Sequence, residues 1–353
     1  MIKASVCPAI YAALEKLKSI ISANRESGRK TVIFCEDRLT LAAERTVCAA
    51  VGGTFTVSVY TFARFLSAER GRRADILTAQ GSAMAIRKII EEKREELKLF
   101  GKFSAAAAAG AVYDTIALLY ASKISAGDLQ KADADGLLQS KLHDIAAVYA
   151  EYEKYLENSG KVDRNAYLSE LPEIIENSEK ISGSDVVFLG FQSFTRSSLD
   201  CARAAFRSAK NVYGLFIGGK EEIYVNEALT SFEGAAEEFG GAEVERVESE
   251  MIQEAEILRK CLFDPETFHT AKPVKSDRVH LFEAADEEEE LEFIAASIKK
   301  FVLDGVRYSD ISVMLSDVAD AERGLRRVFS QYRIPYYADR RHTLSEHAAA
   351  KFV

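Results

Sequence analysis

Short apolar segments alternate with amphipathic ones at the start of the chain, and this alternation limits the fold more than any other feature of the sequence. Met1–Val6, Thr31–Cys35 and Thr54–Tyr60 have the length and composition of strands. Pro8–Ala23 and Leu39–Val51, which lie between them, carry apolar residues at helical spacing. This order is typical of a parallel sheet covered by helices, and it predicts an α/β fold.

The middle of the chain has a different rhythm, because helical spacing continues there without a strand-like segment. We predict an all-helical domain over residues 82–180. Its helices are expected at Met84–Phe100, Ala105–Ser122, Leu137–Asn158 and Tyr167–Asn177. The flanking segments 1–81 and 181–275 are then two parts of one α/β domain that this insertion interrupts.

Strand-like segments return after residue 184. Strands are predicted at Val186–Leu189, Asn211–Ile217 and Ala242–Val247, and helices at Ser197–Ser208, Ile223–Phe239 and Met251–Phe263. The stretch Asp264–Asp277, with a proline and lysines, is interpreted as a linker.

A second α/β domain is predicted to begin at residue 276 and to continue to 353. Its elements are expected to be a strand at Arg278–Glu283, a helix at Asp286–Leu303, a strand at Ile311–Leu315, a helix at Ala319–Tyr332 and a last helix from Ser345 to Val353. Such a domain needs more strands than these, so we expect the chain to be the N-terminal part of a longer protein.

Composition and cysteine spacing exclude several classes of protein. The net charge of −9 gives no overall attraction to nucleic acid, so any such contact requires a local basic surface. The five cysteines are scattered without CxxC or metal-ligand spacing, which predicts free thiols in a reducing compartment and no metal site. We see no signal peptide and no apolar run that approaches a membrane span, so a cytoplasmic location is expected.

A phosphate-binding loop of the G-x-x-x-x-G-K-[ST] type would have to follow the first strand. The segment Ala4–Ala9 has neither glycine nor lysine there, and Pro8 lacks an N–H donor. Gly28–Thr31 has a similar composition, but it precedes a strand instead of a helix. We therefore predict a degenerate loop near Ser5, Cys7 and Pro8, with no bound ATP.

The segment Asp185–Thr195, "DVVFLGFQSFT", is the strand where an ATPase would carry an acidic residue for Mg²⁺. Its end, Leu189-Gly190-Phe191, has no carboxylate, so it is interpreted as a degenerate Walker B strand without cofactor binding. We expect a core strand in which Gly190 permits a tight turn and both nearby phenylalanines pack inward. Thr195 or Ser197 is expected to cap the next helix.

Two basic clusters are candidates for contact with single-stranded nucleic acid. The first comprises Arg64, Arg70, Arg72 and Arg73, and the second comprises Arg323, Arg326, Arg327, Arg333, Arg340, Arg341 and His342. Tyr332, Tyr336 and Tyr337 accompany the second cluster, and rings beside cations suit base stacking with phosphate contact. The alternative is a solvated helix face paired with Asp320, Glu322 and Asp339. The five histidines have no triad order or metal spacing, so no nuclease site is predicted.

Six segments, taken in order, resemble one family: the B subunit of AddAB-type helicase–nucleases, AddB or RexB. They are Arg87–Phe100, Thr115–Leu129, Ser140–Leu156, Val186–Thr195, Asp304–Leu315 and Tyr332–His347. A weaker match covers Thr31 to Ser67. The resemblance implies RecA-like domains of the superfamily 1 helicase type, the first of them with a helical insertion, in a complex that processes broken double-stranded DNA for recombinational repair.

The resemblance also implies that the helicase-like half of the protein guides a DNA strand and is not the main motor. Members usually carry a GKT-type loop, absent here at Ala4–Ala9, and many carry Asp where this chain has Leu189. Both departures predict that this portion does not bind ATP. A nuclease motif and the cysteines of an iron–sulfur cluster are expected only beyond Val353, so no cofactor is expected here.

We therefore predict a non-catalytic, helicase-like portion that positions DNA and binds an AddA-like motor protein. The residues predicted to contact DNA are Tyr60, Thr61, Phe62, Arg64, Arg326, Arg340 and Arg341. The first four are chosen because they follow the third strand, where superfamily 1 helicases have a DNA-facing motif. The alternatives are a protein-interaction scaffold that contacts no DNA and a divergent ATPase.

Overall fold

The computed structural model divides the chain into two compact units, Met1–Ala271 and Lys272–Val353. It describes residues 1–352 apart from 53–54, 72–74, 219–225, 249–251, 263, 340–343 and 345–346. Each unit is considered by itself. The predicted boundary between residues 275 and 276 lies close to this division, and the boundaries predicted within the first unit stay predictions.

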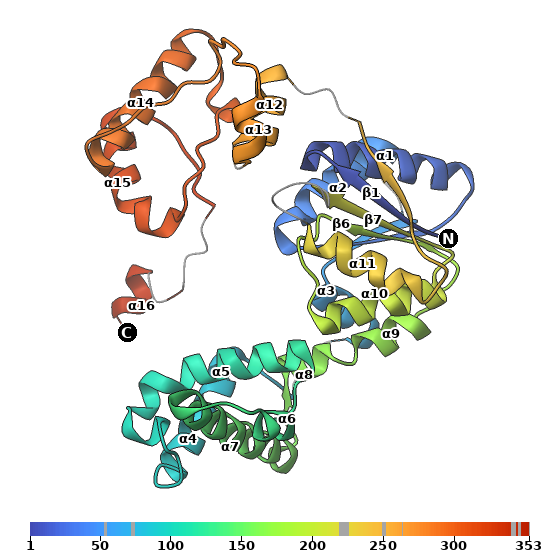
Figure 1. The fold of residues 1–353 in the computed structure, drawn as a ribbon, viewed down its shortest axis with the longest axis vertical. Coiled ribbons are helices and arrows are strands. Elements are labelled where there is room, and N and C mark those ends of the chain that lie inside the picture. Colours follow the sequence, from blue (N-terminus) through green and yellow to red (C-terminus); the bar gives the residue numbers. More distant parts are fainter. Residues whose placement is uncertain are drawn as a thin grey trace. The chain divides into compact units, whose positions relative to one another are not determined.

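A six-stranded sheet, parallel at every described pairing, forms the centre of the first unit (Figure 1). Its order is β3-β2-β6-β7-β1-β8. The strands are β1 (Ile2–Cys7), β2 (Thr31–Cys35), β3 (Val57–Tyr60), β6 (Asp185–Leu189), β7 (Asn211–Ile217) and β8 (Glu243–Arg246). All residues of β2 and β6 are buried, as expected for central parallel strands with helices on both faces. The predicted parallel α/β architecture is confirmed.

Helices cover both faces of this sheet (Figure 1). α1 (Ile10–Glu26) and α2 (Asp37–Val51) pack on one face, around an apolar cluster that includes Leu17, Ile33 and Leu189. The opposite face is covered by α3 (Phe62–Arg70), α9 (Leu171–Asn177), α10 (Arg196–Ser208) and α11 (Glu227–Glu237). Phe188 lies at the centre of the second cluster. The sheet is therefore the middle of three layers.

Four helices between α3 and α8 (Arg164–Leu168) share an apolar core of their own. We call these four helices the helical cluster. It consists of α4 (Ala79–Glu92), α5 (Ala105–Ser122), α6 (Ala126–Lys131) and α7 (Gly136–Ser159), with a 3₁₀ turn at Phe100–Lys102. Two short strands that were not predicted, β4 (Ile76–Leu77) and β5 (Val162–Asp163), pair in parallel beside it. The expectation that this region contains no strand was wrong.

Two predicted helices in this region have different bounds in the structure. α4 ends at Glu92 instead of Phe100, because the backbone N–H groups of Lys98, Leu99 and Phe100 donate to the carboxylate of Asp144 at 2.9, 2.7 and 2.9 Å. The predicted helix Tyr167–Asn177 is two helices, α8 (Arg164–Leu168) and α9, and a proline lies in the first turn of α9.

Helix α5 is, among the described residues, long and apolar enough to cross a membrane by length and composition alone. The expectation that no segment approaches that threshold was therefore wrong. Ala109, Val112 and Ile116 of α5 are buried in the core of the helical cluster. Only 28% of this apolar window is buried, so burial of this face accounts for only part of the apolar character of the helix.

α12 (Gln253–Cys261) and α13 (Pro265–Thr270) close the first unit. The predicted linker Asp264–Asp277 thus contains a helix, which begins where Asp264 Oδ1 accepts the N–H of Glu266 at 3.1 Å. In the second unit, α14 (Glu287–Leu303) packs on α15 (Val318–Gln331), and a short helix α16 (Ala348–Phe352) follows.

The strands predicted at Arg278–Glu283 and Ile311–Leu315 are not found. Both segments lie outside the strands that the structure assigns within its described residues. A strand needs a hydrogen-bonded neighbour, and neither segment has one in a described ladder. Leu281 and Met314 are left 100% and 95% exposed, whereas Ile311 and Leu315 pack against the core between α14 and α15.

Candidate functional site at the carboxyl edge of the sheet

The carboxyl ends of the parallel strands lie at one edge of the sheet, where ligands bind in open α/β folds. The connections that leave this edge begin at Pro8 after β1, Glu36 after β2, Thr61 after β3 and Gly190 after β6. The residues interpreted as degenerate nucleotide motifs and four predicted DNA contacts all lie at or next to this edge.

The connection between β1 and α1 consists of only two residues, Pro8 and Ala9. Ser5 and Cys7 belong to β1 itself and are buried, and Ser5 Oγ donates to Glu245 Oε1 at 2.7 Å. Burial raises the pKa of the Cys7 thiol to about 11, so it stays protonated at neutral pH. A connection of this length cannot wrap the phosphates of a nucleotide with successive backbone N–H groups.

Side chains of α1 and α2 occupy the space next to the C-terminal end of β6. Leu189 is completely buried, and Gly190 has a φ of +72°, where its N–H donates to Leu215 O at 2.9 Å. A Cβ atom on Gly190 would overlap Leu39 Cδ1 and would lie 3.7 Å from Ile10 Cδ1. The prediction of a core strand with a tight glycine turn is confirmed, and the space next to it is occupied by aliphatic carbon.

Aromatic rings pack beneath the turn after β6. Phe191 stacks on Phe194 with ring centroids 5.0 Å apart, which confirms that both rings pack together. Phe62 contributes to the same cluster, at 5.7 Å from Phe191 and 5.2 Å from Phe34. Thr195 caps α10 by accepting the N–H of Ser198 at 3.3 Å, as predicted.

The predicted DNA contacts after β3 have different environments. The ring of Tyr60 packs on Phe65 at 5.4 Å, and Thr61 Oγ1 accepts the N–H of Arg64 at 3.2 Å to cap α3. Arg64 is the exposed member of the group, and its guanidinium lies 3.7 Å from Glu44 Oε1. The structure thus brings Tyr60, Thr61, Phe62 and Arg64 together, while contact with DNA stays a prediction for all four.

The other predicted DNA contacts belong to the second unit. Arg326 extends from α15 with its side chain 69% exposed and pairs with Glu322 Oε1 at 2.8 Å. The neighbouring Arg327 pairs with Glu288 Oε1 at 2.8 Å. Paired cations of this kind match the alternative of a solvated helix face. Arg340 and Arg341 lie outside the described residues.

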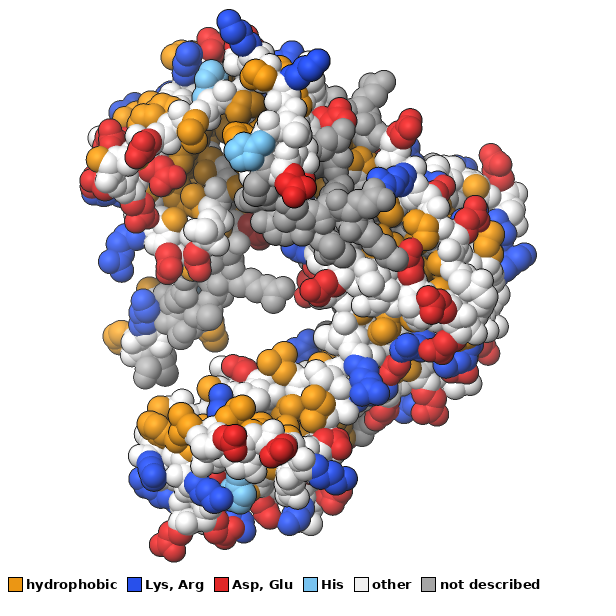
Figure 2. Space-filling model, viewed as in Figure 1, with side chains coloured by type: hydrophobic (Ala, Val, Ile, Leu, Met, Phe, Trp, Pro, Cys, Tyr) orange, Lys and Arg blue, Asp and Glu red, His pale blue; other side chains and the backbone are white. Residues whose placement is uncertain are grey.

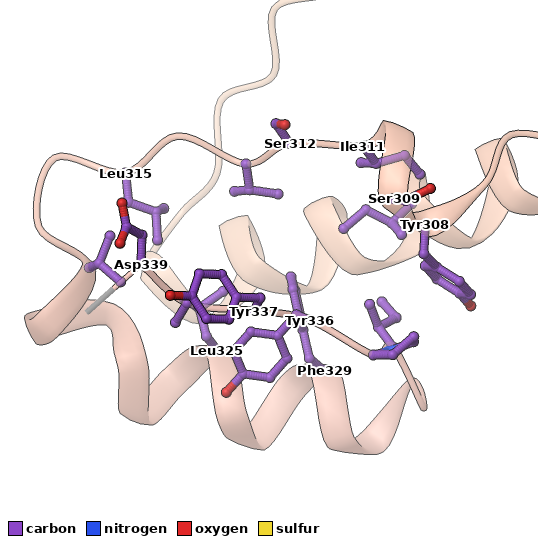
Figure 3. Close-up of a pocket in the computed structure, with 16 residues that line it drawn as sticks. Tyr308, Ser309, Ile311, Ser312, Leu315, Leu325, Phe329, Tyr336, Tyr337 and Asp339 are labelled. Atoms are coloured by element: carbon purple, nitrogen blue, oxygen red, sulfur yellow. The ribbon is translucent and has the colours of Figure 1, made fainter. Parts of the chain in front are cut away.

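An apolar cavity of about 560 Å³, which the sequence did not indicate, lies beside α15 (Figure 3). Its walls include Ile311, Leu325 and Phe329, and the rings of Tyr336 and Tyr337 lie at its rim (Figure 3). Ile311–Leu315, which the sequence predicts to be a strand, forms part of one wall. Because that segment has no described strand beside it, the space next to it is open.

The distribution of charged side chains over the surface bears on whether the protein presents a basic region. On the face shown in Figure 2, blue and red side chains are interspersed over the described residues. Among those residues, no group of three His, Cys, Asp or Glu side chains is placed to hold a metal ion. On this face, an anionic polymer would meet individual lysines and arginines and not a broad basic field.

Comparisons with known proteins identify the family. The model of the family "ADDB, N-terminal" matches residues 11–240. The chain is 27% identical to the B subunit of the ATP-dependent helicase/deoxyribonuclease of Geobacillus kaustophilus, over 92% of the chain and 31% of that protein. For the proteins of the same name from Bacillus subtilis and Listeria innocua, the identities are 24% and 23%, over 92% of the chain and 30% of each protein. The chain thus spans about a third of the length of these relatives. Because the family model covers well over half of its residues, the chain belongs to the ADDB N-terminal family.

Proposed function

We propose that this chain is the helicase-like portion of an AddB-type protein, which positions DNA in a helicase–nuclease complex for DNA repair and does not bind a nucleotide itself. Family membership and the names of the relatives support the role in such a complex. The parallel sheet with helices on both faces is consistent with a RecA-like domain, and the helical cluster with an insertion into it.

The proposal that this chain binds no nucleotide rests on one observation: aliphatic side chains occupy the space next to the C-terminal end of β6. A Mg²⁺-nucleotide needs a carboxylate at the strand end and a loop of N–H donors across from it. This chain has buried Leu189 at the strand end, aliphatic contacts from Leu39 and Ile10, and a two-residue connection after β1. The proposal therefore assigns the carboxyl edge a part in positioning DNA without nucleotide chemistry.

Arg64 and Arg326 support the DNA-positioning part of the proposal, because both guanidinium groups are exposed. Each has a carboxylate partner, which phosphate would have to replace. The same pairing favours the scaffold alternative, in which these arginines only solvate the surface. The partner in either case would be an AddA-like motor protein.

Replacing Arg326 with Gln in the full-length protein, assembled with its motor partner, is expected to weaken binding of single-stranded DNA. Loss of one phosphate contact lowers the slope of log K against log salt by about 0.7 for a single strand. Arg64→Gln is expected to act similarly. The measurement is a fluorescence-anisotropy titration with labelled oligonucleotide at several salt concentrations.

Arg87→Gln is the matched control, because Arg87 also lies on an exposed helix face and pairs with an acid four residues away, Glu91, at 3.0 Å. The control is expected to leave the affinity and the slope unchanged. If Arg64→Gln and Arg326→Gln behave like Arg87→Gln, these arginines do not contact DNA and the scaffold function is favoured.

Equilibrium dialysis of this chain against ATP and Mg²⁺ separates the proposal from a divergent ATPase. We expect no bound nucleotide at ATP concentrations up to the millimolar range, because the two-residue connection between β1 and α1 forms no phosphate loop. Stoichiometric retention of ATP would instead show that the carboxyl edge opens and that the nucleotide-independent function is wrong.

A further inference from the structure

In the first unit, the helical cluster has an apolar core that is separate from the apolar clusters on the two faces of the sheet. The cluster on the α10 face of the sheet, which includes Phe188 and Tyr167, shares no residue with the core of the helical cluster, which includes Ile86 and Tyr152. The described residues that connect the two bodies therefore determine how firmly one is held to the other.

The strand pair β4–β5 is a narrow seam between these bodies. It contains two residue pairs, Ile76 with Val162 and Leu77 with Asp163. Ile76 packs against the sheet core and Leu77 against the helical core, since successive residues of a strand point to opposite sides. A hydrogen bond from Val162 N to Asp75 O, at 3.0 Å, continues the seam.

Asp163 joins this seam firmly to the helical cluster. Its carboxylate is completely buried and accepts the hydroxyls of Tyr152 at 2.8 Å and Ser82 at 3.2 Å. It also accepts the N–H of Asn165 at 2.7 Å and so begins α8. Two residues later, Tyr167 is already part of the sheet core. The transition between the bodies thus occupies only a few residues.

A second contact joins the C-terminal end of α5 to α10, and it is polar. Lys123, in the left-handed conformation with φ of 55°, places its ammonium group against the carboxylate of Asp200. Asp200 also binds Arg203 at 3.1 Å, and Arg203 binds Glu238 of the following helix region at 3.3 Å. The Lys123 and Asp200 side chains are 39% and 25% exposed, so water and salt reach this pair.

We propose that the Lys123–Asp200 ion pair is a releasable clasp, and that the β4–β5 seam is the pivot on which the helical cluster turns relative to the sheet. The seam keeps the two bodies attached when the clasp opens. An exposed ion pair of this kind changes the ratio of closed to open forms by about two- to fivefold at low salt. The clasp therefore holds one orientation without locking it.

The test measures the distance between the two bodies in solution. Cys48 on α2 is exposed, whereas Cys7, Cys35, Cys201 and Cys261 are buried, so Cys48 accepts one spin label. Lys141→Cys on the exposed side of α7 supplies the second position. Pulsed electron spin resonance then gives the distance distribution for this doubly labelled chain and for variants built on it.

Lys123→Gln is expected to raise the population of a second distance about two- to fivefold at low salt, and 1 M NaCl is expected to do the same without the substitution. Lys123→Arg, which keeps the charge, restores the original distribution. Lys131→Gln, on an exposed position of α6, leaves it unchanged. Amide exchange at Val162 is expected to become faster in Lys123→Gln only, because the seam bends when the clasp is open.

Identical distributions with and without Lys123→Gln at both salt concentrations would overturn the proposal. So would an equal change in Lys123→Arg, because the contact would then not depend on charge. A melting curve by circular dichroism accompanies each variant, and an unchanged Tm shows that a new distance arises from reorientation and not from unfolding.

Discussion

Replacing Leu189 with Asp is expected to lower the free energy of unfolding by about 3–5 kcal/mol, and not to create a nucleotide site. The substitution installs the acidic group that an ATPase carries at this strand end, but into a cluster with Cys7, Ile33 and Leu215. A carboxylate there has no cation or loop to bind and loses its hydration. Urea denaturation measures the loss of stability, and equilibrium dialysis measures the absence of ATP.

The pH dependence of this variant identifies the cause. Burial raises the pKa of the introduced carboxyl above its unfolded value of about 3.9. Below pH 3.9 the group is protonated in both states, so the destabilisation is smallest there. It grows by about 1.4 kcal/mol per pH unit as pH rises from the unfolded pKa to the folded one.

Leu189→Asn serves as the control, because it buries a polar group of similar size without a titratable proton. Its destabilisation is expected to be the same at pH 4 and pH 7. If Leu189→Asp is tolerated within 1 kcal/mol at pH 7, or retains ATP, then the strand end is accessible and the non-catalytic function is wrong.

Replacing Asp144 with Asn is expected to cost about 2–4 kcal/mol, because the carboxylate accepts three backbone N–H groups through both of its oxygens. The amide of Asn keeps one acceptor oxygen and turns an NH₂ group toward the remaining donors. Asp144 is completely buried, so water cannot replace the lost bonds. Thermal and urea denaturation of the chain measure the loss.

The sign of the pH effect follows from the pKa of Asp144. Burial raises this pKa, but the backbone donors at Leu99, Phe100 and Lys98 and the ring of His143 lower it by more, so the net shift is downward. The stabilisation by Asp144 is therefore complete above the unfolded pKa and is lost as pH falls through the lower folded pKa. Asp144→Asn removes this part of the acid sensitivity.

Asp128→Asn is a suitable comparison, since Asp128 forms a capping box with Ser125 at an exposed helix start. It is expected to cost less than about 1 kcal/mol. An Asp144→Asn protein as stable as Asp128→Asn would show that the turn after α4 does not depend on the buried carboxylate.

The sequence predicted those elements whose cause is local. β2, α5 and β7 have the predicted bounds, because each is a continuous buried strand or a periodic helix between turn residues. The end of α4 could not be predicted in this way, since it depends on Asp144, which reaches the turn from α7. The unpaired segment Ile311–Leu315 shows a related limit: alternation predicts an extended backbone, but not that a neighbouring strand is present.

In the candidate site, too, features with a local cause could be predicted and features that depend on distant residues could not. The absence of glycine, lysine and carboxylate from the nucleotide motifs could be read directly from the residues near Pro8 and Leu189. That Leu39 and Ile10 fill the space above Gly190 could not, because they come from two helices whose packing is set by the whole sheet. Likewise, the packing of the Phe62 ring against Phe34 and Phe191 could not be predicted, because its position after β3 favours a loop that faces DNA.

The strand order has a consequence for the way the chain acquires its fold. β1 pairs with β7, joining Ile2 to Val212, and β2 pairs with β6, joining Cys35 to Leu189. The helical cluster, by contrast, is assembled from contacts within residues 79–159. Because local contacts form before distant ones, we expect this cluster to fold during synthesis, at a stage when β1 has no partner strand and β2 has only β3 beside it. A ribosome-bound chain that ends before β6 therefore exposes β1 and one edge of β2, and this is the stage at which it most needs protection from aggregation.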